Sequence, residues 1–293
     1  RGIPVRLLEK TSHIGGRIQT EDQNGCKFES GMQFYYSWYR EARQLLREMN
    51  LEQRLYPAPV YGYMTWEGKT ATFDKGQPWL GLMSAGDNFK LWKSVAKRAG
   101  SLLGQDVFRH IPADRMDQVD VAQYFRAEAS DPVLELAVRP MVTSYSFAEP
   151  EGHSMAMLLK IIKLGAAAKT LALVEGNDAL PKAMASRVKT ITGEATAIRT
   201  INGVVRGVEY KNASGASESI DTEHVICAAP PPSGQALFDG LPVLQGMLRK
   251  IDYTSTIMVN FFLDRALPAK GWVYVLSRHD GHRAAFAIDC MKR

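Results

Sequence analysis

A strand-like run ending in an acidic residue opens the sequence, and a turn with two adjacent glycines follows it. Pro4 to Glu9 has the apolar character of a buried strand, and Thr11 to Gly16 is rich in small residues. Gly15 and Gly16 permit positive φ angles and a close approach of the backbone to a ligand. The guanidinium of Arg17 can pair with a diphosphate through two parallel hydrogen bonds. An ordinary turn of two glycines followed by a chance arginine fits the tripeptide equally well, so these residues by themselves leave both interpretations open.

Glu9 stands where a dinucleotide-binding fold places the acid that holds a ribose. In that fold the glycine fingerprint lies about 20 residues before the acid, which here puts it ahead of Arg1. An acid at the end of a strand is also common as a solvated loop charge. Glu9 by itself therefore leaves both interpretations open.

Hydrophobic periodicity predicts a helical middle of the chain and a strand-rich region after it. Helical spacing covers Arg40–Leu51, Asp87–Leu103, Val121–Ala129, Pro132–Arg139 and Ser154–Leu164. Strand-like patterns cover Tyr56–Thr72, Lys189–Ile201, Val204–Lys211, Ser219–Ala229 and Tyr253–Leu263. Asn202 and Gly203 predict a type I′ hairpin turn between two of these strands.

Two helices have expected buried faces. In the Asp87–Leu103 helix we expect the apolar side to be Phe89, Trp92, Ala96, Ala99 and Leu103. A further helix begins at Asn177 or Asp178, which can cap it, and has Pro181 in its first turn. Its expected buried face is Leu180, Ala183, Met184 and Val188.

Composition excludes several classes of protein. With 45% hydrophobic and 23% charged residues the chain is globular, and its longest charge-free stretch, Val225–Phe238, is too short to span a bilayer. A net charge of +5 without a dense basic stripe argues against nucleic-acid binding. Three cysteines without a CxxC pair indicate neither disulfides nor zinc, and hence a reducing, cytoplasmic location. His279 and His282 lack a third ligand nearby, so we expect no metal site.

Several ordered segments resemble the flavin-containing amine oxidase superfamily, which includes protoporphyrinogen oxidases and phytoene desaturases. Residues 5–20, VRLLEKTSHIGGRIQT, resemble its strand, acid and GGR-x-x-T segment. The other similar segments are Phe28–Gly31, Asn177–Val188, Ala195–Ile198 and Val225–Ala228. The resemblance implies a cofactor, FAD, and a fragment that lacks the fingerprint before Arg1 and a C-terminal glycine–acid segment beyond Arg293. It departs from the family at Glu175-Gly176, where relatives have two glycines.

The resemblance also implies roles for individual residues. Glu9 would hold the adenosine ribose, and the backbone of Ala195 would meet the adenine. The diphosphate would lie beside Gly15, Gly16 and Arg17, and the flavin edge beside Gly31, Met32 and Gln33. A flavin accepts the hydride itself, which agrees with the lack of a catalytic triad or paired-carboxylate motif in the sequence.

The resulting expectation is an α/β protein in which an FAD-binding Rossmann-like domain is interleaved with an α+β substrate-binding domain. The FAD domain takes residues 1–50 and 172–238, and the substrate domain takes 51–171 and 239–293. The expected function is oxidation of a C–C or C–N bond in a bulky, largely apolar small molecule. Two alternatives stay open: an NAD-dependent dehydrogenase, which could use Glu9 equally, and a non-catalytic scaffold or peripheral membrane protein of the same fold.

Residues 79–103 combine tryptophans and leucines with a basic helix flank. This composition is typical of an interfacial membrane anchor, although an ordinary packed helix is the stronger expectation. The sequence thus predicts a cytoplasmic protein and leaves open contact with a membrane surface.

Overall fold

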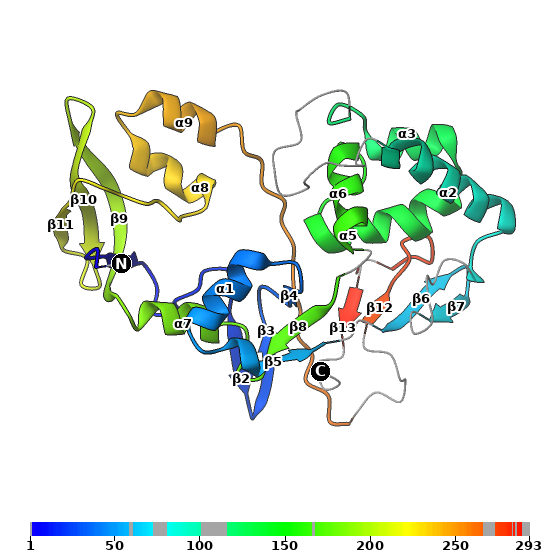
Figure 1. Cartoon of the computed structure of the whole chain (residues 1–293), viewed down its shortest axis with the longest axis horizontal. Coiled ribbons are helices and arrows are strands. Elements are labelled where there is room, and N and C mark those ends of the chain that lie inside the picture. Colours follow the sequence, from blue (N-terminus) through cyan, green and yellow to red (C-terminus); the bar gives the residue numbers. More distant parts are fainter. Residues whose placement is uncertain are drawn as a thin grey trace.

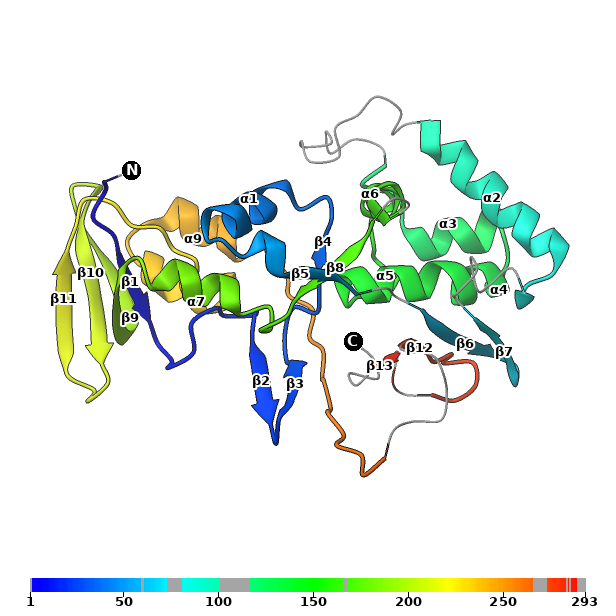
Figure 2. The same ribbon diagram turned by 60° about the horizontal axis from the view of Figure 1, so that its bottom comes forward.

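The computed structural model describes residues 2–58, 61–72, 81–100, 116–165, 168–265, 273–282, 284 and 286–288. The molecule is elongated, with a strand-rich lobe at the N-terminal end and a mainly helical lobe opposite (Figure 1). A small sheet of β4 (Tyr35–Tyr36), β8 (Thr170–Leu173) and β5 (Leu55–Pro57) lies between them (Figure 2). The chain passes toward the helical lobe through β5 and returns through β8, and it crosses again outside this sheet along the segment after α9 (Figure 1).

The remaining elements are as follows. The other strands are β1 (Arg6–Glu9), β2 (Thr20–Gln23), β3 (Cys26–Glu29), β6 (Gly62–Trp66), β7 (Lys69–Thr72), β9 (Lys189–Ile201), β10 (Val204–Asn212), β11 (Ser217–Asp221), β12 (Val273–Val275) and β13 (Phe286–Ile288). The α-helices are α1 (Arg40–Glu48), α2 (Ala85–Ala99), α3 (Val121–Glu128), α4 (Asp131–Val133), α5 (Arg139–Ser146), α6 (Met155–Gly165), α7 (Ala179–Ala185), α8 (Pro231–Gly234) and α9 (Pro242–Leu248). Short 3₁₀ segments are η1 (Glu52–Arg54) and η5 (Gln235–Phe238), and η4 (Leu134–Val138) is a π-helical turn between α4 and α5.

The first sheet joins the start of the chain to a hairpin far along it. Its strand order is β1-β9-β10-β11, with β1 parallel to β9 and the other pairs antiparallel. The β9–β10 turn has φ angles of 51° at Asn202 and 76° at Gly203, so the predicted type I′ turn is confirmed. The sheet places the end of β1 beside Thr192 of β9.

The second sheet, β13-β12-β6-β7, supports the helical lobe. Its strand β6 pairs in parallel with β12, which comes much later in the chain. Side chains from this sheet and from the helices above it form the larger core, which includes Met64, Val121, Phe125, Leu136 and Leu158. A smaller core around Tyr35, Leu46, Leu173 and Leu180 lies under α1 and α7. The helices predicted over Arg40–Leu51, Val121–Ala129 and Ser154–Leu164 are all present within a few residues.

The expected buried face of the long basic helix is wrong. In α2 the buried residues are Leu91 and Ser94, whereas Phe89 is 68% and Trp92 is 52% exposed. The cause is α3, whose Tyr124 hydroxyl donates to the Ser94 carbonyl at 3.0 Å. A small residue at 94 lets α3 approach that side, so the bulkier aromatic side turns away from the core. The predicted end of the helix at Leu103 lies outside the described residues.

Three further expectations differ from the structure. The strand predicted over Ser219–Ala229 ends at Asp221, and Tyr253–Leu263 is extended chain rather than a strand. Neither the Val225–Ala229 segment nor Tyr253–Leu263 pairs with a strand in the described part of the chain, and β propensity without a partner makes no ladder. In α7 the buried residues are Leu180 and Ala185, because the helix is shorter than its apolar pattern and Met184 faces outward.

Candidate functional site

The two glycines of the GGR turn have different surroundings. Gly15 has a φ of 136°, and a Cβ there would lie 2.4 Å from the Ile18 carbonyl oxygen, so a side chain is excluded. Gly16 has a φ of 56°, and a Cβ there would have no described heavy atom within 4 Å. The backbone at Gly16 and the side chain of Arg17 are exposed. The turn therefore depends on glycine at both positions, and its outer side is exposed.

The second predicted segment, Gly31 to Gln33, packs directly against this turn. The Met32 N–H donates to the Arg17 carbonyl at 2.9 Å. A Cβ on Gly31 would lie 2.0 Å from that same carbonyl oxygen, so only glycine permits the approach. The guanidinium carbon of Arg17 lies 6.0 Å from the centroid of the Tyr253 ring, at the limit of a cation–π contact. The fold therefore brings Gly15, Gly16, Arg17 and Gly31–Gln33 together.

The Gln33 side chain folds back on its own segment. Its Nε2 donates to the carbonyls of Glu29 at 2.9 Å and Gly31 at 3.0 Å. Met32 packs against the smaller core. These contacts hold Gly31–Gln33 in an irregular conformation, because the segment belongs to no β-sheet.

Glu9 and Ala195 lie near the same end of the β1–β9 pair. Glu9 aligns with Thr192, three positions before Ala195, and Ala195 lies opposite Tyr210 of β10. One carboxylate oxygen of Glu9 accepts from the Thr11 N–H at 2.9 Å and the Thr11 hydroxyl at 3.1 Å. Lys10 bridges the two strands to Glu194 at 2.8 Å. One oxygen of the Glu9 carboxylate thus stabilises the turn that follows β1. Its other oxygen accepts no hydrogen bond from the described residues.

The departure at Glu175-Gly176 does not prevent a close backbone approach. Gly176 has a φ of 106°, and a Cβ there would lie 2.4 Å from the Thr20 side chain. Glu175 forms an ion pair with Arg54. The single glycine supplies the tight turn, and the half-buried acidic residue beside it is paired with Arg54.

A buried polar network behind Gly31–Gln33 was missed by sequence reasoning. Glu29, Asn177 and Asp178 are all at most 3% exposed. The Thr20 hydroxyl donates to Glu29 at 2.8 Å, and the Asn177 N–H donates to the other oxygen of Glu29 at 3.0 Å. Asp178 occupies the N-cap position of α7 without a side-chain capping bond. The only sequence signal was the capping preference of Asn and Asp, which indicates a helix start and not a tertiary network.

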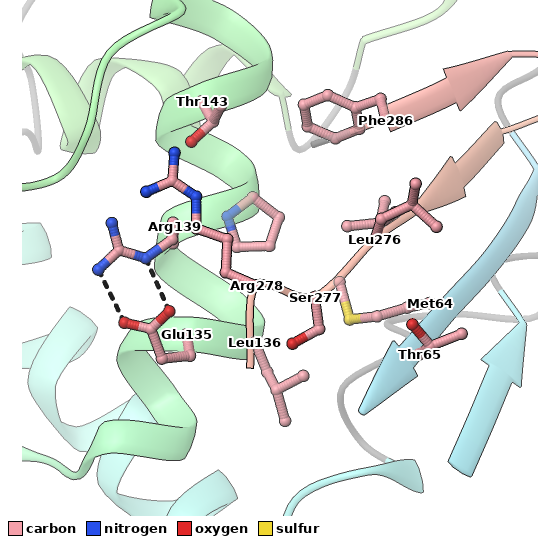
Figure 3. Close-up of a pocket in the computed structure, with 12 residues that line it drawn as sticks. Met64, Thr65, Glu135, Leu136, Arg139, Thr143, Leu276, Ser277, Arg278 and Phe286 are labelled. Atoms are coloured by element: carbon pink, nitrogen blue, oxygen red, sulfur yellow. Dashed lines mark hydrogen bonds and ion pairs between the residues drawn. The ribbon is translucent and has the colours of Figure 1, made fainter. Parts of the chain in front are cut away.

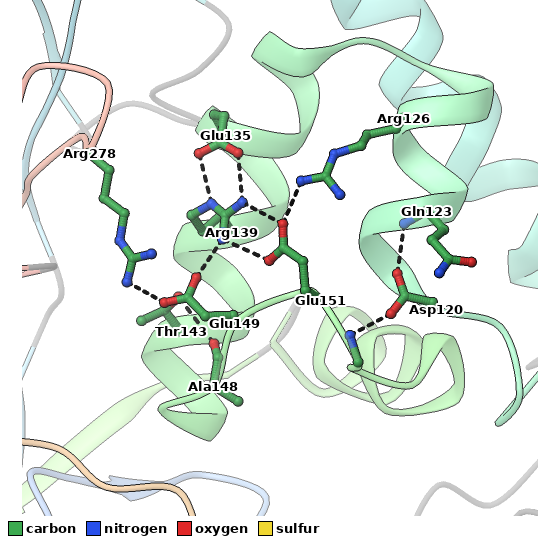
Figure 4. Close-up of polar contacts among 11 residues, drawn as sticks. Asp120, Gln123, Arg126, Glu135, Arg139, Thr143, Ala148, Glu149, Glu151 and Arg278 are labelled. Carbon is green, nitrogen blue, oxygen red and sulfur yellow. Dashed lines mark hydrogen bonds and ion pairs between the residues drawn. The ribbon is translucent and has the colours of Figure 1, made fainter.

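A second charged cluster lies in the helical lobe. The Arg139 guanidinium, 13% exposed, donates to both oxygens of Glu135 at 2.7 Å and also pairs with Glu149 and Glu151 (Figure 4). Arg126 pairs with Glu151, and Arg278 with Glu149. The cluster ties α3, α5 and the loop after α5 to the turn after β12.

A small pocket adjoins this cluster. It lies between β6, α5 and the β12–β13 strands, with Met64, Leu136, Thr143 and Phe286 among its lining residues (Figure 3). None of its lining residues is a predicted flavin contact. The Arg139 guanidinium beside the pocket is already paired with three glutamates. We therefore assign the pocket and the charged cluster a structural role.

The charged cluster predicts an acid-labile helical lobe. Hydrogen bonds from Arg139 hold the pKa of Glu151 at about 2, against 4.5 for a free glutamate. A lowered folded-state pKa gives stability that is complete above pH 4.5 and is lost as the pH falls toward 2. We expect Glu151→Gln to flatten the fall in melting temperature across this window, with Glu223→Gln, on an exposed loop, as the control. If the melting temperature of Glu151→Gln fell with pH as steeply as that of the parent, Glu151 would not be the cause of the acid lability.

The described residues form neither a metal-ligand cluster nor a membrane-spanning helix. Within them no group of three or more His, Cys, Asp or Glu side chains is placed to hold a metal ion. Every helix in the described part of the chain is too short or too polar to cross a bilayer.

A comparison with models of protein families shows to which family the chain belongs. The family model described as flavin-containing amine oxidoreductase matches residues 1–285. The chain belongs to this family. A flavin is therefore the cofactor type of its family, and the resemblance drawn from the GGR segment is confirmed. No curated protein sequence matches the chain.

Solved structures agree with the flavin amine oxidoreductase fold. A protein assigned as a protoporphyrinogen oxidase from an Exiguobacterium species has a TM-score of 0.65 at 17% identity, over 99% of this chain and 67% of its own. Putrescine oxidase gives 0.62 at 14% identity, over 80% and 55%. Cyclohexylamine oxidase from Brevibacterium oxydans gives 0.61 at 17%, over 83% and 56%. The predicted α/β flavin-binding fold is confirmed, and the chain spans between about half and two thirds of these relatives.

Proposed function

We propose that this protein is an FAD-dependent oxidoreductase that oxidises a C–C or C–N bond of a bulky, largely apolar small molecule. The observation that carries the proposal is the packing of the GGR turn against Gly31–Gln33, with the Met32 N–H bonded to the Arg17 carbonyl. Both segments need glycine for their contact, and Gly16 and Arg17 are exposed beside it. This arrangement suits the diphosphate and ring edge of one dinucleotide.

The residues present fit FAD in particular. Gly16 gives a ligand access to the backbone, and Arg17 supplies a charge that can pair with the diphosphate. Glu9 retains a carboxylate oxygen for a ribose hydroxyl, and the Ala195 backbone lies near it for the adenine. Gly31, Met32 and Gln33 would follow the flavin edge. A flavin without its adenosine would leave Glu9 and Ala195 with no ligand.

The division into domains is part of the proposal. We propose an FAD domain of residues 1–50 and 172–238 and a substrate domain of 51–171 and 239–293. The parallel pairing of β1 with β9 supports the first grouping, and the pairing of β6 with β12 supports the second.

When bound, the flavin would accept a hydride from the substrate. The chain's own residues would bind the substrate beside the ring and exclude water. An aromatic cluster follows the Gly31–Gln33 segment directly: Tyr36 stacks on Trp38 at 5.5 Å and on Tyr145 of α5 at 5.8 Å. Burial and the neighbouring Tyr145 raise the pKa of Tyr36 above its usual range, so its phenol stays neutral. Such surfaces favour a large apolar substrate over a small polar one.

Anaerobic reduction of the bound flavin tests the substrate class. We expect protoporphyrinogen or cyclohexylamine to bleach the visible absorption of the flavin, and putrescine, which carries a charge at each end, to leave it unchanged. If putrescine reduced the flavin and the other two compounds did not, the proposal of a largely apolar substrate would be wrong. Bound NAD in place of flavin would favour a dehydrogenase, and the absence of any bound cofactor would favour a non-catalytic scaffold.

Arg17→Ala should weaken FAD binding by about 1.5 to 3 kcal/mol, the range for a hydrogen bond to a charged group. The exposed guanidinium would lose a charge-assisted pair with the diphosphate, while its backbone contact with Met32 stays. Equilibrium dialysis with FAD measures the change, and Arg40→Ala at the exposed start of α1 is the control. Equal dissociation constants for Arg17→Ala and the parent would rule out this pairing.

The exposed face of α2 supports a second proposal, contact with a membrane surface from the cytoplasm. Phe89 and Trp92 are exposed one helical turn apart. Lys90 and Lys93 lie beside them, whereas Lys97 pairs with Glu128. Aromatic side chains beside lysines suit the headgroup region of an anionic bilayer. Each lysine near that surface would contribute about 1 kcal/mol.

Vesicle co-sedimentation tests the membrane contact. We expect the protein to sediment with anionic vesicles and not with neutral ones, and to be released by raised salt. The double variant Phe89→Ser/Trp92→Ser should reduce binding about tenfold or more, whereas Ile201→Ser in the β9–β10 hairpin should not. Sedimentation of the double variant at the parent's level would contradict the proposal.

A further inference from the structure

One side chain connects the two separated segments of the proposed flavin domain. Asn177 is fully buried, directly before α7. Its Nδ2 donates to the carbonyls of Met32 and Gln33, both at 3.0 Å. Its Oδ1 accepts from the Leu173 N–H at 3.3 Å. The amide thus binds two backbone carbonyls on one segment and one N–H on the other.

The backbone of Asn177 is held as firmly as its side chain. Its N–H donates to Glu29 at 3.0 Å, and its carbonyl accepts from the buried Tyr35 hydroxyl at 2.9 Å. Glu29 and Tyr35 flank the Gly31–Gln33 segment on its two sides. The residue is therefore bonded to this segment before, within and after the predicted flavin contacts.

We propose that Asn177 is a positioning residue that fixes the backbone of Met32 and Gln33 and so sets the conformation in which Gly31–Gln33 meets the flavin. The inference rests on the proposed function. The segment belongs to no strand, so no sheet ladder fixes its backbone, and the Met32 N–H donates to the Arg17 carbonyl of the GGR turn. With both carbonyls turned inward to Asn177, the opposite side of the segment faces the GGR turn.

Only an asparagine-like group fits this position. Two donors and one acceptor on one short side chain are needed, and a carboxylate would place oxygens against two carbonyl oxygens beside Glu29. Alanine would remove the hydrogen bonds that Asn177 makes to two carbonyls and to the Leu173 N–H in the protein interior. Asn177→Asp is therefore the sharpest variant, because it keeps the shape and removes both donors.

The chain offers a matched control. Asn88 in α2 likewise donates from Nδ2 to two backbone carbonyls, those of Met83 at 3.2 Å and Ser84 at 3.0 Å. It lies in the helical lobe, away from the predicted flavin contacts. Asn88→Asp removes the same kind of contact without touching Gly31–Gln33.

The test measures FAD binding by visible difference spectra and backbone hydrogen exchange in the protein without flavin. For Asn177→Asp we expect an FAD dissociation constant raised about tenfold, a shifted flavin spectrum, and exchange in residues 29–35 faster by about tenfold. Asn88→Asp should match the parent in all three. If Asn177→Asp does not fold, Tyr35→Phe, which removes only the hydroxyl bonded to Asn177, should change the same quantities by about threefold.

The outcomes separate the two proposals. A parent protein that binds no FAD overturns the proposed function, while faster exchange confined to residues 29–35 would still support the bracing by Asn177. A parent that binds FAD, together with Asn177 or Tyr35 variants that match it in spectrum, affinity and exchange, overturns the inference. A uniform rise in exchange over the whole chain would also overturn it, since that indicates general destabilisation.

Discussion

We expect Arg139→Met to lower the free energy of unfolding by about 3 kcal/mol, the lower part of the range for breaking a buried ion pair. Arg139 is the most buried member of its cluster and neutralises Glu135, Glu149 and Glu151 together. Methionine keeps much of the side-chain volume but leaves these carboxylates close to one another without their common cation. Urea unfolding of the helical lobe, followed by circular dichroism, measures the loss.

The cluster supplies its own control for Arg139→Met. Arg126 is 49% exposed and, among the described residues, pairs with Glu151 alone, so Arg126→Met should cost less than about 1 kcal/mol. Arg139→Lys should fall between the two, because an ammonium keeps the charge and loses the bidentate geometry. Equal losses for Arg139→Met and Arg126→Met would show that the cluster is an ordinary surface network.

Gly31→Ala should abolish flavin binding at micromolar FAD, a loss of at least about a hundredfold in affinity. A methyl group at this position would lie 2.0 Å from the Arg17 carbonyl oxygen, so the two segments must separate. Overpacking against backbone also costs about 2 to 3 kcal/mol of folding stability. Fluorescence titration with FAD and thermal unfolding measure the two effects.

Gly25→Ala is the comparison for Gly31→Ala. Gly25 lies at the β2–β3 hairpin turn with a φ of 79°, and a Cβ there would have no described heavy atom within 4 Å. Gly25→Ala should lower stability by about 1 kcal/mol, because alanine disfavours the left-handed conformation at this position. It should leave the FAD affinity unchanged. Retained FAD affinity in a folded Gly31→Ala would mean that the flavin does not approach this segment.

Local sequence signals predicted much of the fold. The turn at Asn202-Gly203 and the helix over Val121–Ala129 depend on residues close in the chain, and both are present. The GGR segment also carried a local signal, because two adjacent glycines permit the positive φ angles that this turn adopts. These features need no knowledge of what packs against them.

Features that depend on distant partners were not predictable in the same way. The α2 helix has apolar residues on more than one side, and only the approach of Tyr124 to Ser94 selects the buried one. Tyr253–Leu263 has the composition of a strand, but a strand also needs a neighbour to bond with, and none is present in the described chain. Hydrophobic periodicity identifies a surface that can be buried. It does not identify the element that packs against that surface.

The same limit applies to the candidate site. Glu9, Gly15 and Arg17 are contiguous enough to be recognised as one motif. Asn177 is far from Gly31–Gln33 in sequence, and its position before a helix predicted a cap. Its amide instead serves two carbonyls of the other segment, which only the three-dimensional structure shows.

In the proposed function this chain holds one FAD along the surface that the GGR turn and Gly31–Gln33 form together. The most direct measurement is the ratio of bound flavin to protein, from visible absorption after extensive dialysis of the purified protein. We expect about one FAD per chain in the parent and almost none in Gly31→Ala. A parent protein without flavin absorption after reconstitution with excess FAD would contradict it.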